Sequence, residues 1–344
     1  MSKRIVYCAD GTWQDAMSNT NVYRLYKAML QTSDQVAYYD DGVGADATGL
    51  ARLVQGAFGT TLTQKVLDAY TKIAHVYEPG DQIYLFGFSR GAFTARSLGG
   101  MIASCGLPSG SFTDDCVTQV FAAYRDPTNR ASMLANLSEY SLADATITMV
   151  GAWDTVGALG IPAIFGGIDV SQFGFLDTTL HPDVKNAYQC CAIDEQRAQF
   201  PITLWTSAPA PGQTIEQVWF SGCHGDVGGG TLVGGPVDNG TRLCDISMGY
   251  MLSKAQALGL TFDPTAAAQY GTLAADFALD IIRESWKPTD GAPHLRPIPP
   301  NSKVSNSVAL RIQYALTYQP GNLTITNNAL ADIYTQLPLV SMGV

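Results

Sequence analysis

A serine lies between two glycines in the stretch Gly87-Phe88-Ser89-Arg90-Gly91, which matches the pattern G-x-S-x-G. The apolar run Gln82–Phe86 precedes this stretch and predicts a buried strand, and a helical pattern reaching about Cys105 follows it. A strand-to-helix turn this sharp needs small residues on both sides of the serine, and it exposes the hydroxyl above the sheet. The pattern therefore predicts that Ser89 is a nucleophile. The alternative is a tight turn with a capping serine.

A serine hydroxyl needs a base to take its proton at neutral pH, and that base is usually a histidine. The chain has four histidines. His224 follows the predicted strand Gln217–Gly222 and opens a glycine-rich turn. The other three lie in a predicted helix, before a proline and in a proline-rich stretch: His75, His181 and His294. We therefore expect His224 to be the base, with a hydrogen-bonded loop histidine as the alternative.

A carboxylate should orient the histidine and stabilise its cation. Asp154 ends the predicted strand Thr146–Trp153, at the sheet edge where α/β active sites form. It also fits the chain order Ser, Asp, His that is typical of G-x-S-x-G hydrolases. Asp194 follows another predicted strand and Asp226 is close to His224, so both remain alternatives to Asp154.

Backbone amides beside the nucleophile would stabilise an oxyanion. One set lies at the start of the helix after Ser89, and another follows the first predicted strand, Arg4–Ala9. The expected oxyanion-hole residues are Gly11, Thr12 and Arg90. The expected substrate-pocket residues are Asp10, Phe88 and Asp226. The alternative for the first loop is an ordinary turn in which the Asp10 side chain bonds its own backbone.

The elements that position these residues alternate between strand and helix, which predicts a mostly parallel α/β sheet with helices on both faces. Because the first strand already carries the oxyanion loop, we expect the sheet to start without a leading hairpin. Residues 1–260 are expected to form the catalytic domain, with a cap-like insertion near 155–183. Residues 261–344 are expected to pack on that domain as an extension that includes a late strand, Val308–Tyr318. The apolar stretch Ile161–Leu180 could form an acyl-chain pocket or lid, or could simply pack on the core.

Composition excludes several classes of protein. The 344 residues are 46% hydrophobic and only 15% charged, with 20 Lys and Arg against 30 Asp and Glu, so the formal net charge is −10. An acidic chain without basic runs lacks the features of a nucleic-acid binder or of a polybasic membrane anchor. No stretch approaches the ~18 consecutive apolar residues of a membrane-spanning helix.

The N-terminus and the cysteines favour a cytoplasmic protein. Asp10 ends the first apolar run too early for a signal peptide. The seven cysteines show no C-x-x-C spacing and are expected to be buried thiols. Export by a route that needs no cleaved leader fits the same sequence.

We expect neither a cofactor nor a metal ion. The stretch Cys8-Ala9-Asp10-Gly11-Thr12 has a cysteine where a phosphatase pattern needs its nucleophilic aspartate, and no phosphate-binding loop ends in the required lysine. A metal site built from Asp10, His224 and Asp226 is the alternative.

Taken together, five stretches resemble the uncharacterised α/β-hydrolase domain family that includes phospholipase effectors of the bacterial type VI secretion system. They are Cys8–Thr12 (CADGT), Tyr84–Leu98 (YLFGFSRGAFTARSL), Gly151–Gly160 (GAWDTVGALG), Ala192–Phe200 (AIDEQRAQF) and Val218–Gly230 (VWFSGCHGDVGGG). The resemblance implies an α/β-hydrolase-like fold and a Ser-Asp-His hydrolase of ester bonds, with lipids as the substrate class. It places the nucleophile, acid and base on Ser89, Asp154 and His224. Two residues depart from the family pattern: Gln189, where relatives often carry histidine, and Gly225, where serine is common.

The sequence thus predicts a serine ester hydrolase of the lipase or phospholipase kind that works through an acyl-enzyme. The alternative is a non-catalytic binding or structural protein on a hydrolase scaffold.

Overall fold

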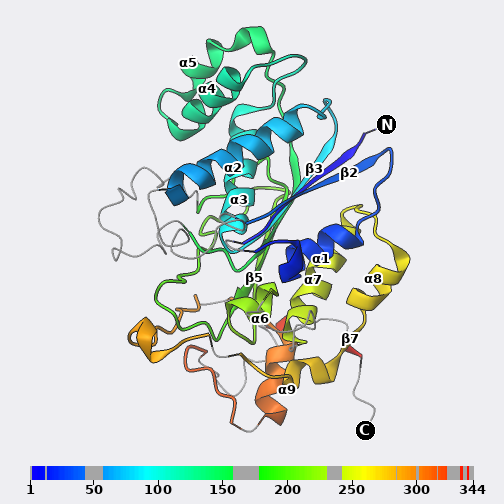
Figure 1. The fold of residues 1–344 in the computed structure, drawn as a ribbon, viewed down its shortest axis with the longest axis vertical. Helices are drawn as coiled ribbons and strands as arrows, with labels where there is room; N and C mark the ends of the chain where they lie inside the picture. The colour runs from blue at the N-terminus through cyan, green and yellow to red at the C-terminus, as the bar shows by residue number, and fades with distance from the viewer. Residues whose placement is uncertain are drawn as a thin grey trace.

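The structure is a computed structural model that describes ten stretches of the chain (Figure 1). They are residues 2–11, 14–42, 57–157, 178–230, 242–283, 285–299, 302–315, 317–323, 334–335 and 339–340. Thr12, most of the predicted cap-like insertion and most of the apolar stretch Ile161–Leu180 lie outside the described residues.

A parallel sheet forms the centre of the molecule. Its eight strands follow the order β2-β1-β3-β4-β5-β6-β8-β9, and each neighbouring pair is parallel. These strands are β1 (Arg4–Ala9), β2 (Gln35–Asp40), β3 (Gln82–Phe88), β4 (Ile147–Trp153), β5 (Asn186–Ala192), β6 (Thr214–Phe220), β8 (Lys303–Ser305) and β9 (Tyr334–Thr335). A separate short pair joins β7 (Leu273–Ala274) to β10 (Leu339–Val340). The predicted fold class is confirmed: in the described chain the sheet is parallel from β1 onward.

Helices cover both faces of the sheet, so its central strands are buried on both sides. The helices are α1 (Asn21–Ala28), α2 (Ala57–Ala74), α3 (Arg90–Cys105), α4 (Asp114–Arg125), α5 (Arg130–Ala135), α6 (His224–Gly228), α7 (Leu243–Ala257), α8 (Pro264–Gly271) and α9 (Asn306–Tyr314). Figure 1 shows α2 and α3 on one side of the sheet and α1 and α7 on the other. Within β1, Ile5 and Tyr7 pack towards the first side and Val6 and Cys8 towards the second. Strands buried on both faces in this way carry continuous apolar runs, as the sequence of β1 does.

The order in which the chain adds strands to the sheet reverses between the neighbours β1 and β3: β2 lies on one side of β1, whereas β3 and β4 follow on the other side. The chain leaves β1 for α1 on one face, and it leaves β3 for α3 on the other face (Figure 1). The loops after the two strands therefore diverge at their carboxyl ends. Crevices at such switch points are where open α/β sheets bind ligands.

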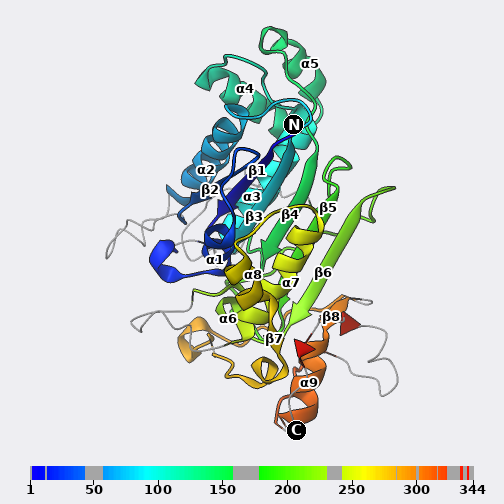
Figure 2. The same cartoon turned by 90° about the vertical axis from the view of Figure 1, so that its right-hand side faces the viewer.

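The C-terminal part of the chain differs from the predicted secondary structure. The expected strand Val308–Tyr318 is wrong, because these residues fall largely in helix α9. Alternating apolar residues suggested a strand, but Ser305 caps a helix by accepting a hydrogen bond from the Ser307 amide at 3.2 Å. The strand of this region is instead β8, which lies beside the end of β6 (Figure 2).

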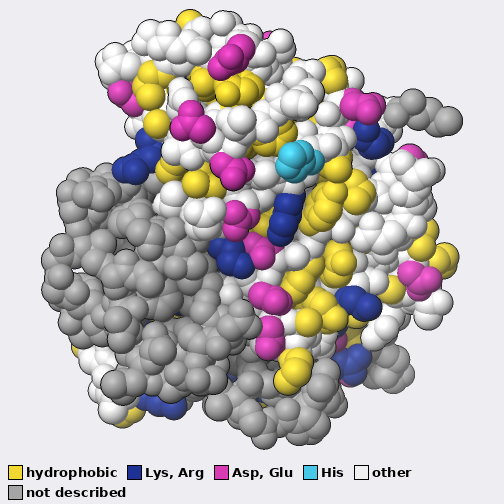
Figure 3. Space-filling view, turned by 45° about the horizontal axis from the view of Figure 1, so that its top comes forward, with side chains coloured by type: hydrophobic (Ala, Val, Ile, Leu, Met, Phe, Trp, Pro, Cys, Tyr) yellow, Lys and Arg dark blue, Asp and Glu magenta, His cyan; other side chains and the backbone are white. Residues whose placement is uncertain are grey.

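On the coloured part of the face in Figure 3, Lys and Arg side chains are interspersed with Asp and Glu. Among the helices that the structure describes, none is both long enough and apolar enough to cross a membrane.

Candidate active site

Ser89 occupies a strained turn between β3 and α3. Its backbone has φ 57° and ψ −122°, a combination that residues with a side chain rarely adopt. Both neighbouring glycines are needed because the backbone approaches them closely. A Cβ on Gly87 would lie 2.3 Å from the Gly91 carbonyl oxygen, and a Cβ on Gly91 would lie 2.1 Å from that of Ala9. The G-x-S-x-G pattern is thus explained by two close approaches of the backbone that hold Ser89 at the strand end.

Asp154 is the next residue after β4, just as Ser89 is the next residue after β3. The register pairs Phe88 with Trp153, so the two side chains start from adjacent positions at one sheet edge. The Ser89 amide donates to the Trp153 carbonyl at 2.9 Å, and the Asp154 amide donates to the Cys190 carbonyl at 2.8 Å. Asp154 also has a positive φ, 46°, and is fully buried.

His224 is the first residue of α6, which follows β6. Its Nδ1 lies 2.6 Å from Oδ2 of Asp154, within hydrogen-bonding distance. The ring packs against Phe88, with centroids 4.6 Å apart, and against Phe200 at 5.0 Å. Because Nδ1 is bonded to Asp154, Nε2 is the nitrogen that remains for proton transfer.

The two alternative acids are engaged elsewhere. Asp194 accepts hydrogen bonds from the Gly222 amide at 2.6 Å and from the Tyr318 hydroxyl at 2.9 Å. Asp226 accepts from the amides of Cys223 and Arg283. Within the described residues, Asp154 is the carboxylate that bonds the imidazole of His224.

The loop after β1 lies directly against the nucleophile. A Cβ on Gly11 would lie 3.3 Å from Cβ of Ser89 and 3.2 Å from the ring of Phe88. The Gly11 amide donates to Oδ1 of its neighbour Asp10 at 2.7 Å. This bond is the one expected for the ordinary turn, and it occupies the Gly11 donor. Of the other two expected oxyanion donors, Arg90 begins α3, whereas Thr12 lies outside the described residues.

The expected pocket residues are buried and engaged within the protein. Asp10 accepts hydrogen bonds from the hydroxyls of Thr20 and Tyr39, both at 2.7 Å. Burial raises the pKa of Asp10 to about 6 despite these bonds. Burial likewise raises the pKa of Asp226 to about 6. Phe88 supports the His224 ring from inside the core rather than facing solvent.

The environment keeps Asp154 ionised and His224 neutral. Burial alone would raise the pKa of Asp154, but the Arg296 guanidinium and the hydrogen bond from His224 outweigh burial and hold that pKa below its usual range. Burial lowers the pKa of His224, and the attraction of Asp154 offsets this only in part. A neutral imidazole beside an ionised carboxylate is the state that a general base needs at neutral pH.

Sequence reasoning missed two buried side chains at this site. Arg296 donates to both carboxylate oxygens of Asp154, at 2.7 and 3.0 Å. Glu195 accepts a hydrogen bond from the His224 amide at 3.1 Å and pairs with Arg197. A signal for Glu195 was present, because it follows the end of β5 next to Asp194. Arg296 lies in a proline-rich stretch with no motif, and the sequence carries no signal for its role.

Gln189, one of the two departures from the family pattern, is part of an internal polar network. It is fully buried, its Nε2 donates to the Thr203 carbonyl at 3.1 Å, and its Oε1 accepts from Thr155. Its hydrogen bonds are therefore made within the protein.

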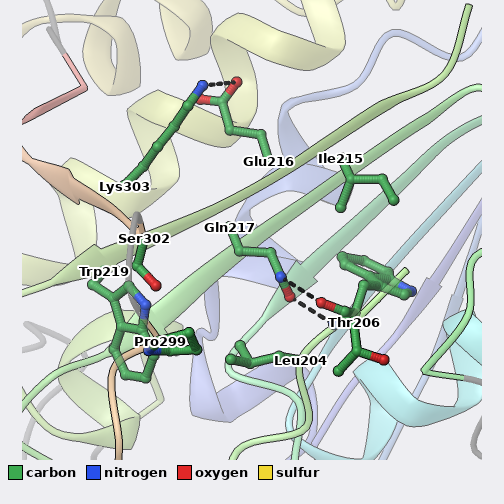
Figure 4. A pocket seen from close by; sticks show the side chains of 10 residues that line it. Leu204, Thr206, Ile215, Glu216, Gln217, Trp219, Pro299, Ser302 and Lys303 are labelled. Atoms are coloured by element: carbon green, nitrogen blue, oxygen red, sulfur yellow. Dashed lines mark hydrogen bonds and ion pairs between the residues drawn. The ribbon is translucent and has the colours of Figure 1, made fainter. Parts of the chain in front are cut away.

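A separate pocket of about 440 Å³ lies beside β6 (Figure 4). It is lined by Leu204, Trp205, Thr206, Ile215, Glu216, Gln217, Trp219, Pro299, Ser302 and Lys303. Two pairs of polar groups are bonded within it: Gln217 bonds the backbone of Trp205, and Lys303 lies 3.3 Å from Glu216. Neither Ser89 nor His224 lines it.

No group of three or more His, Cys, Asp or Glu side chains in the described stretches is arranged to hold a metal ion.

Parts of the chain match a family of known proteins and a curated yeast protein. The family model described as the catalytic domain of Tle1-like phospholipase effectors of the type VI secretion system matches residues 3–254. An uncharacterised protein of Saccharomyces cerevisiae is 29% identical over 234 residues, which cover 60% of this chain and 33% of that protein. The chain thus spans about a third of the length of this curated relative.

Two solved structures that match parts of the chain share little sequence with it. An uncharacterised protein from Pseudomonas aeruginosa is 18% identical with a TM-score of 0.46, covering 78% of this chain and 48% of that one. The structure of the Tle1 effector bound to the VgrG spike is also 18% identical, with a TM-score of 0.35, covering 69% of this chain and 53% of that one. The chain therefore spans about half of each of these two.

Proposed function

Because the chain belongs to the family of Tle1-like phospholipase effector catalytic domains of the type VI secretion system, we propose that it is a serine hydrolase of carboxylic ester bonds. The hydrogen bond between His224 Nδ1 and Asp154 Oδ2, at 2.6 Å, carries this proposal. It joins a base and an acid at the sheet edge where a strained serine ends the neighbouring strand. This combination is the one that activates a serine for attack on an acyl carbon.

In the proposed reaction His224 Nε2 takes the hydroxyl proton of Ser89 as Oγ bonds to the acyl carbon. The ester C–O bond then breaks, and the proton moves from His224 to the departing alkoxide. Water next attacks the acyl-enzyme, with its proton passing to His224. When the acid product leaves, Oγ of Ser89 takes that proton back, and the enzyme returns to its starting state. Asp154 remains ionised throughout and stabilises the imidazolium.

Two backbone amides are proposed to stabilise the oxyanion. The first is that of Arg90, because Arg90 begins α3 and the positive end of a helix dipole stabilises a developing negative charge. The second is that of Thr12, since the Gly11 amide already donates to Asp10. Gly11 itself provides space, because a side chain there would contact Ser89.

Lipids are the proposed substrate class. The family description names phospholipase effectors, and this supports a phospholipid or a related acyl ester. The proposal concerns the chemistry of this domain, because the chain spans only part of its relatives.

Labelling with a fluorophosphonate tests the nucleophile directly, because the probe reacts only with an activated serine. We expect wild type to be labelled and Ser89→Ala to lose both labelling and turnover of p-nitrophenyl esters and phospholipids. Ser97→Ala is the matched control, since Ser97 is a buried serine further along α3. Unlabelled, inactive wild type would instead support a non-catalytic binding protein on a hydrolase scaffold.

A further inference from the structure

Arg296 reaches the active site from a part of the chain that follows the region matched by the family model. That region ends at residue 254, whereas Arg296 lies in the proline-rich stretch between the short 3-10 helix Pro288–Asp290 and β8. Pro297 favours an extended backbone at the residue before it, which is Arg296. The stretch is anchored beside the end of β5: the His294 amide donates to the Gln196 carbonyl at 2.7 Å.

The guanidinium of Arg296 makes four hydrogen bonds in the core. Two go to the carboxylate of Asp154, at 2.7 and 3.0 Å, one to each oxygen. The other two go to the carbonyls of Ala192 at 3.0 Å and Phe200 at 2.7 Å. Arg296 is only 2% exposed, so this pair is shielded from solvent. A bidentate contact of this kind fixes the plane of the carboxylate and favours its ionised form.

The backbone of Arg296 is held in place as well. Asn322 donates from its side-chain amide to the Arg296 carbonyl at 3.1 Å and to the Ile193 carbonyl at 3.0 Å. Asn322 thus ties the Arg296 segment to the chain that leaves β5, next to the Ala192 amide, which itself donates to Asp154 at 2.8 Å. Arg296 is therefore held in place through both its backbone carbonyl and its side chain.

We propose that Arg296 is a positioning residue of the active site, which holds the Asp154 carboxylate ionised and turned towards His224. This inference rests on the proposed serine mechanism. Asp154 has no contact with solvent, and an isolated buried carboxylate would take up a proton rather than remain charged. The guanidinium compensates that charge, and the bidentate contact leaves Oδ2 directed at Nδ1 of His224.

The charge of Arg296 also acts on His224. Three charged side chains from different segments of the chain act on the imidazole: Asp154, Glu195 and Arg296. Three more titratable side chains lie around them. Arg197 forms an ion pair with Glu195, Cys191 lies beside Asp154, and Asp226 belongs to α6, the helix that begins with His224. The cation of Arg296 lowers the pKa of His224, whereas the two carboxylates raise it. Removing that cation should therefore raise the pKa of His224, so that the imidazole keeps its proton up to a higher pH.

The test compares Arg296→Gln, which removes the charge, with Arg296→Lys, which keeps the charge but loses the bidentate contact. Arg311→Gln is the matched control, because Arg311 is also buried in the C-terminal segment but donates to the carbonyls of Ala278 and Asp280. The primary readout is NMR titration of the histidine ring protons. With four histidines in the chain, the His224 signal is identified by its loss in His224→Gln.

We expect the His224 titration midpoint to move upward by about one pH unit or more in Arg296→Gln. It should stay near the wild-type value in Arg296→Lys and in Arg311→Gln. The rising limb of kcat/KM should move with the midpoint in Arg296→Gln. In Arg296→Lys, kcat should fall about tenfold or more with little change in KM, because small displacements of reacting groups are expensive in rate.

An unchanged His224 midpoint in folded Arg296→Gln would overturn the inference. If that variant does not fold, Arg296→Lys decides, and wild-type kcat in Arg296→Lys would overturn the inference. Either result leaves the proposed hydrolase activity intact when wild type is labelled at Ser89. Conversely, an inactive, unlabelled wild type defeats the proposed function, whereas the NMR titration still reports whether Arg296 controls the protonation of His224.

Discussion

Ser89 and Asp154 hold matching positions on two neighbouring strands, and both have a positive φ, 57° and 46°. They are two of the four non-glycine residues with positive φ in the described chain. Such backbone strain costs about 1–3 kcal/mol per residue and persists where the surrounding structure holds it in place. Here the strained turns place the Ser89 hydroxyl and the Asp154 carboxylate at the same edge of the sheet. The hydrogen bond to Asp154 holds the imidazole of His224 at that edge as well.

Replacing Asp154 with Asn should lower kcat about 10⁴-fold, since the imidazole would lose the acceptor that selects its tautomer. Asp194→Asn is the matched comparison, because Asp194 bonds Tyr318 and Gly222 rather than the imidazole. We expect that variant to retain most of its turnover of p-nitrophenyl esters. Equal losses in the two variants would contradict the assignment of the acid.

The pH dependence of kcat/KM should follow the deprotonation of His224. Burial lowers the pKa of this histidine, so the base is already neutral at pH 7. Activity should therefore rise with pH below about 6.5, the ordinary value for histidine, and level off before neutrality. Initial rates measured from pH 4.5 to pH 8 test this, and a rising limb centred above pH 7 would show that the imidazole is not held neutral.

A side chain on Gly11 should interfere with the nucleophile. The added Cβ of Gly11→Ala would press on Cβ of Ser89 at 3.3 Å and on Phe88 at 3.2 Å, closer than most carbon contacts. We expect kcat/KM to fall about tenfold or more with only a small change in melting temperature, because small displacements of reacting groups are expensive in rate. Gly271→Ala serves as the control, since no atom lies within 4 Å of the added carbon there. Wild-type activity in Gly11→Ala would separate this loop from the reaction.

Glu195 should contribute to stability at neutral pH and lose that contribution in acid. Its interactions with Arg197 outweigh burial and hold its pKa at about 2, below the ordinary value. A depressed carboxylate pKa stabilises the fold above the unfolded-state value of about 4.3, and this contribution disappears as the pH falls towards 2. The difference corresponds to ~3 kcal/mol at pH 7.

Urea unfolding of Glu195→Gln measures this contribution. The variant should be less stable than wild type at pH 7, and the gap should narrow as the pH is lowered from 5 to 3. The same change at exposed Glu139 should leave stability nearly unchanged. A gap of constant size across that pH range would mean that the charge of Glu195 is not the cause.

The sequence by itself determined the elements and the turn at Ser89. Strand and helix depend on periodicity and on nearby breaking residues, so the alternation around β3 and α3 could be read directly, and the glycines at 87 and 91 predicted the elbow between them. Even there a local signal failed once: alternating apolar residues in 308–318 suggested a strand, whereas a cap at Ser305 and burial of one face give a helix.

Only the tertiary structure decided which distant groups meet. Asp154, Asp194 and Asp226 all follow strands or their turns. The chain order Ser, Asp, His disfavours Asp226, which follows His224, but it cannot separate Asp154 from Asp194. The choice depends on strand register and on where α6 begins, which place Asp154 beside an imidazole 70 residues away. Arg296 is 142 residues from Asp154 and belongs to no motif. Its contact exists because an extended, proline-bounded segment crosses the end of β5, and the path of such a segment is fixed by packing rather than by its own sequence.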